Sequence, residues 1–397
     1  MVRRRFSFIL VLPLLAAACA SDGDQRVGSD AGDSPAAPTV TVDQIAATPE
    51  EDTISALVNR FHAEHPDPLI DPGALVSGGP PPDGIPPIDE PRFLQTDEVD
   101  FLEDTEPVLA ITVGDESRAY PVQVLIWHEI VNDTIGGIPV TVSYCPLCNS
   151  AIAYDRRLGD RVLDFGTSGL LYNSALVMYD RQTETLWSHF TGEAAIGHLA
   201  GEVLDVLPVS TVSWADWREA NPDGLVLSRD TGHDRSYGTN PYPGYDDVTS
   251  SPFLFDGEVD GRLAAKERIL GIERHGEAAA IRLEALQEDG VEHLDLGPDA
   301  LVAWVVDGTV SALDAGTVSG GRDVGATGVF SRVVDGEELR FEADGDGFVD
   351  DRTGSTWNVL GEATAGPLAG TRLDAVPHVD TFWFAWAAFR PDTVVVR

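Results

Sequence analysis

Residues 108–122 read VLAITVGDESRAYPV and residues 269–283 read ILGIERHGEAAAIRL, so one pattern of apolar and polar positions occurs twice. Short apolar runs on either side of a turn signal, such as Gly114-Asp115 in the first stretch, predict a pair of strands. Self-similarity at a fixed offset is the signature of repeated structural units. These stretches therefore predict that the chain contains two copies of one fold.

Further matches keep the same order along the chain. Asp180–Trp187 (DRQTETLW) resembles Asp351–Trp357 (DRTGSTW). The matched positions that follow are Leu199-Ala200-Gly201, Pro208, Trp217 and Pro222 against Leu368-Ala369-Gly370, Pro377, Trp386 and Pro391. We predict two tandem copies of one domain, residues 105–225 and 265–397, joined by a Gly/Pro/Tyr-rich linker at 226–264. Short apolar runs dominate both copies, so the predicted fold class is β-rich α+β, mostly antiparallel, with short helices.

The N-terminus has the layout of an export signal. Arg3, Arg4 and Arg5 precede an apolar run that ends in three alanines before Cys19. This arrangement predicts a cleaved signal peptide at residues 1–18 and lipidation of Cys19. We therefore expect a lipid-anchored protein of the cell envelope, facing away from the cytoplasm. Ordinary cleavage, which would give a soluble secreted protein, is the alternative.

Two segments separate the predicted anchor from the first copy. Residues 19–50 are rich in Asp, Gly, Ser, Pro and Ala without apolar periodicity, which predicts a flexible tether. Residues 51–104 begin with a predicted amphipathic helix over 52–65. The density of Pro and Gly over 66–91 then predicts an extended segment lying on a domain surface.

The composition is strongly acidic. The 397 residues include 26 basic and 66 acidic side chains, a net charge of −40, and loss of the three signal-peptide arginines leaves 23 basic side chains and a net charge of −43. Nucleic-acid binding depends on Lys and Arg contacts with phosphates. The charge therefore excludes a nucleic-acid partner and leaves the membrane, through Cys19, as the expected partner.

Three features occur in the first copy only, and residues needed merely to build the domain should occur in both. They are Trp127-His128-Glu129, Cys145-Pro146-Leu147-Cys148 and the segment 165–174, FGTSGLLYNS. The second copy has no cysteine, and its glycine segment is shortened to 341–344. We therefore expect the first copy to carry the chemistry and the second to be structural.

The Cys145/Cys148 pair permits three kinds of chemistry. As a redox pair, one thiolate attacks a disulfide and the other resolves the intermediate; we take Cys145, before proline on the exposed side of its loop, as the attacker. As a soft-metal site, two thiolates and the imidazole of His128 could hold copper or zinc. A static disulfide is the third option. Whether the protein is an enzyme stays open, and a redox or metal-delivery partner in the envelope is unidentified.

Other candidate residues flank this pair. His128 and Glu129 are predicted to lie on a short helix ending at Asn132-Asp133 and could serve as an acid/base pair. Tyr172 and Asn173, in the Gly/Ser-rich loop, are candidate ligand contacts. Residues 342–347 resemble a calcium loop without its closing glutamate, so a hairpin turn is predicted there, with weak calcium binding as the alternative.

A binding or scaffolding module is the competing interpretation. In it the disulfide is inert, and the repeat builds a groove for a glycan, a peptide or a protein. Trp127, Tyr172, Trp187 and the linker stretch 241–245 (PYPGY) would suit such a groove.

Four motifs resemble a known family. They are GPPPDGIP at 79–86, WHEIVND at 127–133, YCPLC at 144–148 and MYDRQTETLW at 178–187. Together they are similar to the extracytoplasmic domain-of-unknown-function family catalogued as 3179, found in exported bacterial and archaeal proteins. The resemblance covers most of the chain from Gly78 onward. It implies the identity of the domain and leaves the mechanism open, because the family has no established activity.

Overall fold

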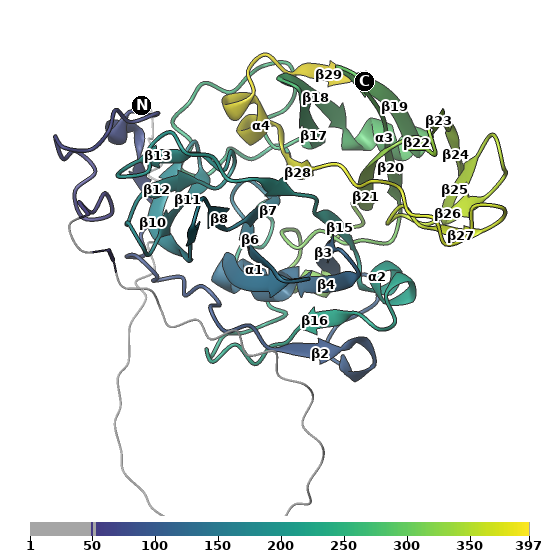
Figure 1. Ribbon diagram of the computed structural model, residues 1–397, viewed down its shortest axis with the longest axis horizontal. Helices are drawn as coiled ribbons and strands as arrows, with labels where there is room; N and C mark the ends of the chain where they lie inside the picture. The colour runs from purple at the N-terminus through teal and green to yellow at the C-terminus, as the bar shows by residue number, and fades with distance from the viewer. Residues whose placement is uncertain (1–48, 51–52, 397) are drawn as a thin grey trace, which may run out of the picture. The chain divides into compact units, whose positions relative to one another are not determined.

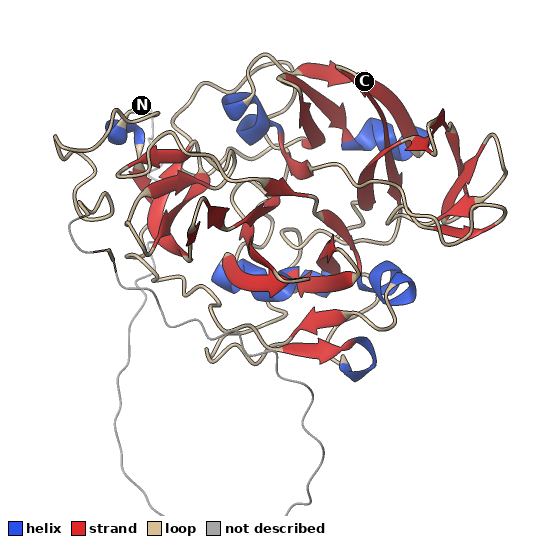
Figure 2. Cartoon of the chain, in the orientation of Figure 1, coloured by secondary structure: helices blue, strands red, loops and turns tan. Residues whose placement is uncertain are grey.

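The structure is a computed structural model that describes residues 49–50 and 53–396 (Figures 1 and 2). Strands dominate, and each of the four α-helices in this part is seven residues long. Most strand pairs are antiparallel, which confirms the predicted β-rich class. No helix within the described ranges is long and apolar enough to cross a membrane. The predicted signal peptide, Cys19 and nearly all of the tether lie outside the described residues.

The first half of the fold alternates hairpins with two short helices. Its elements are β3 (Pro107–Val113), β4 (Glu116–Pro121), α1 (Val122–His128), β5 (Ile130–Ile135), β6 (Ile138–Cys145), β7 (Ser150–Asp155), β8 (Arg157–Leu158), β9 (Arg161–Val162), β10 (Phe165–Tyr172), β11 (Ala175–Asp180), β12 (Leu186–Ser188), β13 (Ala194–Ile196), β14 (Val206–Leu207), β15 (Ser210–Ser213), α2 (Trp214–Ala220) and β16 (Leu225–Leu227). Helix α2 begins after Ser213, whose side chain accepts a hydrogen bond from the Asp216 N–H, as expected of an N-cap.

The second half repeats this order almost element by element. Its elements are β17 (Arg268–Arg274), β18 (Glu277–Arg282), α3 (Leu283–Asp289), β19 (Val291–Leu296), β20 (Asp299–Val306), η3 (Val318–Gly320), β21 (Ala326–Ser331), β22 (Val333–Val334), β23 (Glu337–Glu338), β24 (Phe341–Asp344), β25 (Gly347–Asp350), β26 (Thr356–Trp357), β27 (Ala363–Ala365), β28 (His378–Phe382), α4 (Trp383–Phe389) and β29 (Val394–Val396). The hairpin turn predicted within 342–347 is confirmed by the pairing of β24 with β25.

The sequence motif repeated at 180–187 forms the same turn in both halves. The Trp187 indole donates to the Asp180 carboxylate at 2.8 Å, and the Trp357 indole donates to Asp350 at 3.2 Å. The motif is therefore a buried structural turn. The structural equivalent of Asp180 is Asp350 and not Asp351, which the sequence comparison paired with it. The hydrogen bond requires the aspartate to precede the tryptophan by the same number of residues in both halves.

The two halves pack against each other reciprocally. Strand β28 lies against β7, and the equivalent strand β15 lies against β21 (Figure 1). One hydrophobic cluster combines Leu109 and Cys145 with Phe382, and another combines Trp214 with Trp304. Each half thus completes part of the other's core. The boundaries of the two copies, and their origin by duplication, stay predictions.

The N-terminal segment lies on the first half as an extended strap. Its regular elements are η1 (Pro72–Ala74), β1 (Val76–Ser77), β2 (Phe93–Gln95) and η2 (Thr96–Glu98). The helix predicted over 52–65 is wrong, since residues 53–65 form turns. Val58 and Phe61 remain 84% and 63% exposed, so no apolar face is buried that could stabilise so short a helix.

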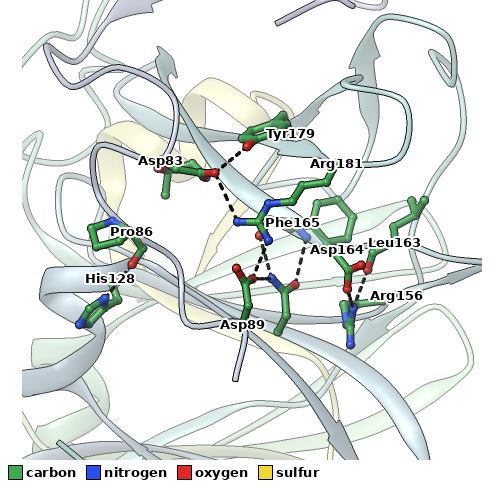
Figure 3. Close-up of polar contacts among 12 residues, drawn as sticks. Asp83, Pro86, Asp89, His128, Arg156, Leu163, Asp164, Phe165, Tyr179 and Arg181 are labelled. Atoms are coloured by element: carbon green, nitrogen blue, oxygen red, sulfur yellow. Dashed lines mark hydrogen bonds and ion pairs between the residues drawn. The ribbon is translucent and has the colours of Figure 1, made fainter. Parts of the chain in front are cut away.

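Polar contacts hold the strap at residues 78–91 (Figure 3). Asp83 accepts a hydrogen bond from Tyr179 at 2.7 Å and pairs with Arg181, which also pairs with Asp89 at 2.7 Å. Beneath the strap, β10 contains a bulge at Gly169, with φ at 75°. A Cβ there would stand 2.1 Å from the Pro80 carbonyl oxygen, so only glycine lets the strap lie this close.

Substitution Gly169→Ala should therefore loosen the strap and destabilise the fold by about 2 kcal/mol or more. Gly114→Ala is the control, because Gly114 has a similar positive φ of 60° but open space around its Cβ position. Chemical denaturation and limited proteolysis within 78–91 measure both effects. Equal stability losses in the two variants would contradict the steric argument.

Candidate functional site

The two cysteines lie in a tight turn between β6 and β7. Cys145 is the last residue of β6 and pairs with Ser150, so residues 146–149 close the hairpin, and Asn149 adopts a φ of 51°. Both residues carry free thiols and are 1% and 0% exposed. The prediction of an exposed loop is wrong, because other parts of the chain cover this turn. The second half replaces it with the longer segment 307–325.

The cover comes from the linker and from the second half. The Tyr245 hydroxyl donates to the Leu147 carbonyl at 2.9 Å. The Cys148 carbonyl accepts from the Thr381 hydroxyl at 2.7 Å and from the Phe382 N–H at 3.1 Å. The predicted linker is thus packed on the thiol turn at Tyr245, and β28 fixes the turn from another side.

The pKa values of the two thiols shift in opposite directions. The Cys145 thiol itself donates to the Ser174 carbonyl at 3.9 Å. Burial raises the pKa of its thiol, but hydrogen bonds from the Cys148 thiol and from the backbone N–H groups of Cys148, Leu176 and Leu147 outweigh burial and lower it. Burial raises the pKa of Cys148 well above its usual value, and its hydrogen bond to Cys145 and the Cys145 charge add to that shift. Of the two thiols, Cys145 is therefore the one that ionises more readily.

A buried hydrogen-bond relay leads away from Cys148. The Ser150 hydroxyl is 2.9 Å from the Cys148 sulfur and 2.8 Å from Nε2 of His189, whose Nδ1 is 2.7 Å from the Ser143 hydroxyl. Ser143 donates its only hydroxyl proton to the Ile152 carbonyl at 3.0 Å. His189 Nδ1–H must then donate to Ser143, Ser150 must donate to Nε2, and Ser150 accepts from Cys148.

Sequence reasoning missed His189. No motif spacing links it to the cysteines, because it follows β12 and meets β6 and β7 only in the folded protein. Ser143 and Ser150 were the available sequence signal. Both are polar residues in apolar strand segments on either side of the cysteines, and buried hydroxyl groups require a hydrogen-bond partner. Burial lowers the pKa of His189 to about 3, so its ring is neutral at physiological pH.

Glu129 lies at the end of α1 in a strained conformation. The helix ends at His128 and is followed by β5, so the prediction that it continues to Asn132-Asp133 is wrong. Glu129 has a φ of 60°, which costs a non-glycine residue about 1–2 kcal/mol. It is only 8% exposed. Burial raises the pKa of its carboxyl well above the usual value, and the charge of Cys145 adds to the shift.

The Glu129 side chain faces a cavity of about 140 Å³. The lining is mainly apolar and comes from the strap, the thiol turn, β10, β11 and the linker: Gly78, Pro80, Ile85, Glu129, Leu147, Thr167, Gly169, Leu170, Leu171, Leu176, Tyr242 and Phe253. Gly78 and Phe253 are exposed, so the cavity opens to solvent beside them. Much of the segment predicted as a Gly/Ser loop is strand β10, one wall of this cavity. Tyr172 and Asn173 do not line it; they lie at the β10–β11 turn.

His128 belongs to a different environment. Its Nδ1 lies 2.7 Å from the Pro86 carbonyl of the strap (Figure 3) and its Nε2 lies 2.7 Å from the Tyr237 hydroxyl. Burial lowers the pKa of His128 to about 4. Both ring nitrogens are thus engaged away from the cysteines, and no group of three or more His, Cys, Asp or Glu side chains in the described part of the chain is arranged to hold a metal.

The aromatic residues suggested for a binding groove are dispersed or buried. Trp187 is fully buried and cannot line a groove. Trp127 donates its indole N–H to the Thr239 carbonyl, and the Tyr172 ring packs edge-on against Phe389. Of the suggested set, only Tyr242 of the stretch 241–245 lines the cavity beside Glu129.

Fold and site together define a β-rich protein with a buried, free Cys-x-x-Cys pair and a strained carboxyl nearby. The chain belongs to the family described as "Protein of unknown function (DUF3179)", which matches residues 82–393, well over half of the chain. This match confirms the resemblance of the four sequence motifs. No curated protein and no solved structure matches the chain.

The neutral state of His189 predicts a pH dependence of stability. Its pKa is about 3 in the folded protein and about 6.5 when unfolded, so between these values only the unfolded chain binds the proton. The contribution is fully present above about pH 6.5 and is lost as pH falls toward 3, by up to about 1.4 kcal/mol per pH unit. His189→Gln should flatten this slope in urea unfolding between pH 4 and 7.

His198→Gln is the matched control, because His198 is exposed and makes none of the relay contacts. An unchanged slope in His189→Gln would show that the ring is not held neutral in the folded state.

Proposed function

We propose that the protein is a thiol-dependent oxidoreductase in which Cys145 attacks an oxidised small molecule and Cys148 resolves the product. The buried pair of free thiols, with the Ser150 hydroxyl 2.9 Å from the Cys148 sulfur, carries this proposal, and the hydrogen-bond donors that lower the pKa of Cys145 support it. Such donors stabilise a thiolate, which is the reactive form of cysteine. A cysteine serving only as a buried apolar side chain, or locked in a static disulfide, has no need of them.

The reaction proceeds in two steps. The Cys145 thiolate attacks the substrate and forms a covalent sulfur adduct, while the reduced part of the substrate leaves with a proton. Cys148 then attacks the Cys145 sulfur, giving an intramolecular disulfide and the second product. The two thiols lose two electrons in total and the substrate gains them. An external dithiol must reduce the disulfide before the next cycle.

The relay through Ser150 supports Cys148 as the resolving residue. The single thiol proton of Cys148 has three acceptors nearby, the Cys145 sulfur, the Cys145 carbonyl oxygen and the Ser150 hydroxyl. Once Cys145 has reacted, its sulfur no longer carries the charge that holds this proton. The Ser150 hydroxyl, which itself donates to His189, then orients the Cys148 sulfur, and the Cys148 proton leaves with the group displaced from Cys145.

Burial of the pair favours a small substrate. Tyr245 and β28 close over the thiol turn, and both cysteines are almost completely inaccessible. The disulfide of a folded partner protein cannot approach Cys145 unless this cover opens. The cavity lined by Leu147 and Leu176 stops short of the two sulfurs, because neither cysteine is among its lining residues, so a small molecule reaches Cys145 from it only by displacing part of this wall.

Cys145→Ser should abolish oxidation of the pair, because the attacking sulfur is lost. Cys148→Ser should still react once and stop at an adduct on Cys145. Each protein is treated with one equivalent of oxidant, its remaining free thiols are alkylated, and the mass of the intact protein is measured. The mass distinguishes the disulfide from the adduct. A Cys145→Ser variant in which Cys148 reacts at the wild-type rate would reverse the assigned roles. A pair that no small oxidant or dithiol interconverts would refute the redox function.

We also propose that the protein acts outside the cytoplasm as a Cys19-anchored lipoprotein. Support comes from the basic residues, the apolar run and the alanines before Cys19. Cys19→Ser should abolish incorporation of a labelled fatty acid and release the protein from the membrane fraction, whereas Cys145→Ser should not. If the wild-type protein took up no labelled fatty acid, and Cys19→Ser stayed in the membrane fraction, the lipid anchor at Cys19 would be contradicted.

A further inference from the structure

Glu129 and Gly290 occupy equivalent positions in the two halves. The Glu129 N–H donates to the Leu125 carbonyl, and its carbonyl accepts from Tyr144; Gly290 makes the same contacts with Leu286 and Val305. Both adopt a positive φ, 60° and 75°. Glycine tolerates this conformation without strain, and glutamate does not. The first half thus has a glutamate at a position where glycine forms the same backbone structure without strain.

The carboxyl of Glu129 is costly in a second way. It is more than nine-tenths buried and has no side-chain hydrogen bond to another described residue. In the second half a Cβ at Gly290 would stand 2.7 Å from the Cβ of Ala343, so protein fills the equivalent space. In the first half the space beside Glu129 is the cavity. Strain, burial and an unpaired polar group at one residue mark a functional position.

The Cys145 sulfur lies directly behind the wall of this cavity. The N–H groups of Leu147 and Leu176 lie close enough to the sulfur to lower its pKa, and both residues line the cavity. A volume of about 140 Å³ is similar to that of an engineered apolar cavity of about 150 Å³ that binds benzene. The site therefore suits a molecule of about six heavy atoms without charge, since its other lining residues are mainly apolar.

We propose that the cavity binds a small uncharged hydroperoxide and that Glu129 is the catalytic acid for its reduction by Cys145. The proposal rests on the thiol redox function and names its substrate class. A leaving thiolate departs without help, but hydroxide or alkoxide, whose conjugate acids have pKa values near about 16, needs a proton. A neutral carboxyl next to a thiolate supplies that proton, so this pairing fits an O–O bond better than an S–S bond.

The step is balanced. The Cys145 thiolate attacks the terminal peroxide oxygen, the S–O bond forms and the O–O bond breaks. The leaving oxygen takes the Glu129 proton and departs as an alcohol, or as water from hydrogen peroxide. Cys148 then attacks the sulfenic acid, and the disulfide and water form. One hydroperoxide and two thiols thus yield one alcohol, one water and one disulfide, and Glu129 regains its proton from solvent.

The test compares three oxidants and two variants under single-turnover conditions. Wild type should reduce hydrogen peroxide and tert-butyl hydroperoxide, and should reduce cumene hydroperoxide, whose carbon skeleton exceeds the cavity, at least tenfold more slowly. Glu129→Gln keeps the shape of the side chain and should slow both small peroxides by about 100-fold or more. Glu129→Gly should lose the same activity but melt at a higher temperature, because it relieves the strain as Gly290 does.

Alkylation of Cys145 by iodoacetamide and oxidation by dimethyl disulfide separate this proposal from the function on which it rests. Both reactions should persist within threefold in Glu129→Gln, because neither needs a protonated oxygen. Reversible oxidation by dimethyl disulfide with no reaction toward any peroxide would overturn the hydroperoxide proposal alone. Equal rates for the three peroxides, or a Glu129→Gln rate within threefold of wild type, would also overturn it. No reversible oxidation of the pair by any reagent would remove the redox function itself.

Discussion

The Cys148 carbonyl accepts two hydrogen bonds from β28, one from the Thr381 hydroxyl at 2.7 Å and one from the Phe382 N–H at 3.1 Å. The arrangement of the thiols depends on this contact. A four-residue hairpin turn is normally exposed and mobile, and a buried turn must find partners for its backbone groups. Because those partners come from the second half, the thiol turn can be buried only when both halves are folded and packed together.

This contact gives the second half a structural role at the thiol turn. The reciprocal packing of β28 on β7 and of β15 on β21 buries the base of the thiol hairpin. The second half has unstrained residues at the corresponding positions. Gly290 stands at the helix end, and Ala343 fills the space that corresponds to the cavity beside Glu129. The first half keeps a strained, buried glutamate and two buried thiols, and its stability must come from elsewhere in the shared cores. The strained glutamate and the thiols therefore occur in only one of two similar folds.

The opposite protonation preferences of neighbouring acids are the main electrostatic feature of the site. Hydrogen-bond donors lower the pKa of Cys145, while burial and the charge of Cys145 raise the pKa of Glu129. Two acids whose environments push their pKa values apart form a nucleophile and a proton donor at neutral pH. His189, kept neutral by burial, provides an acceptor at the other end of the cysteine pair. Each shift follows from burial plus a specific partner.

The sequence by itself determined the β-rich class, the repeated order of strands and helices, and the family, because local patterns encode them. It also singled out Cys145, Cys148 and Glu129, because the second half lacks them. Only the tertiary structure decided that the thiols are buried, that His189 rather than His128 connects to them, and that the strap, β10 and the linker enclose a cavity beside Glu129. The physical reason is that these contacts join residues about 40 to more than 200 positions apart, such as Ser150 with His189 and Cys148 with Thr381. Local propensity carries no information about such partners, whereas packing of the two halves selects them.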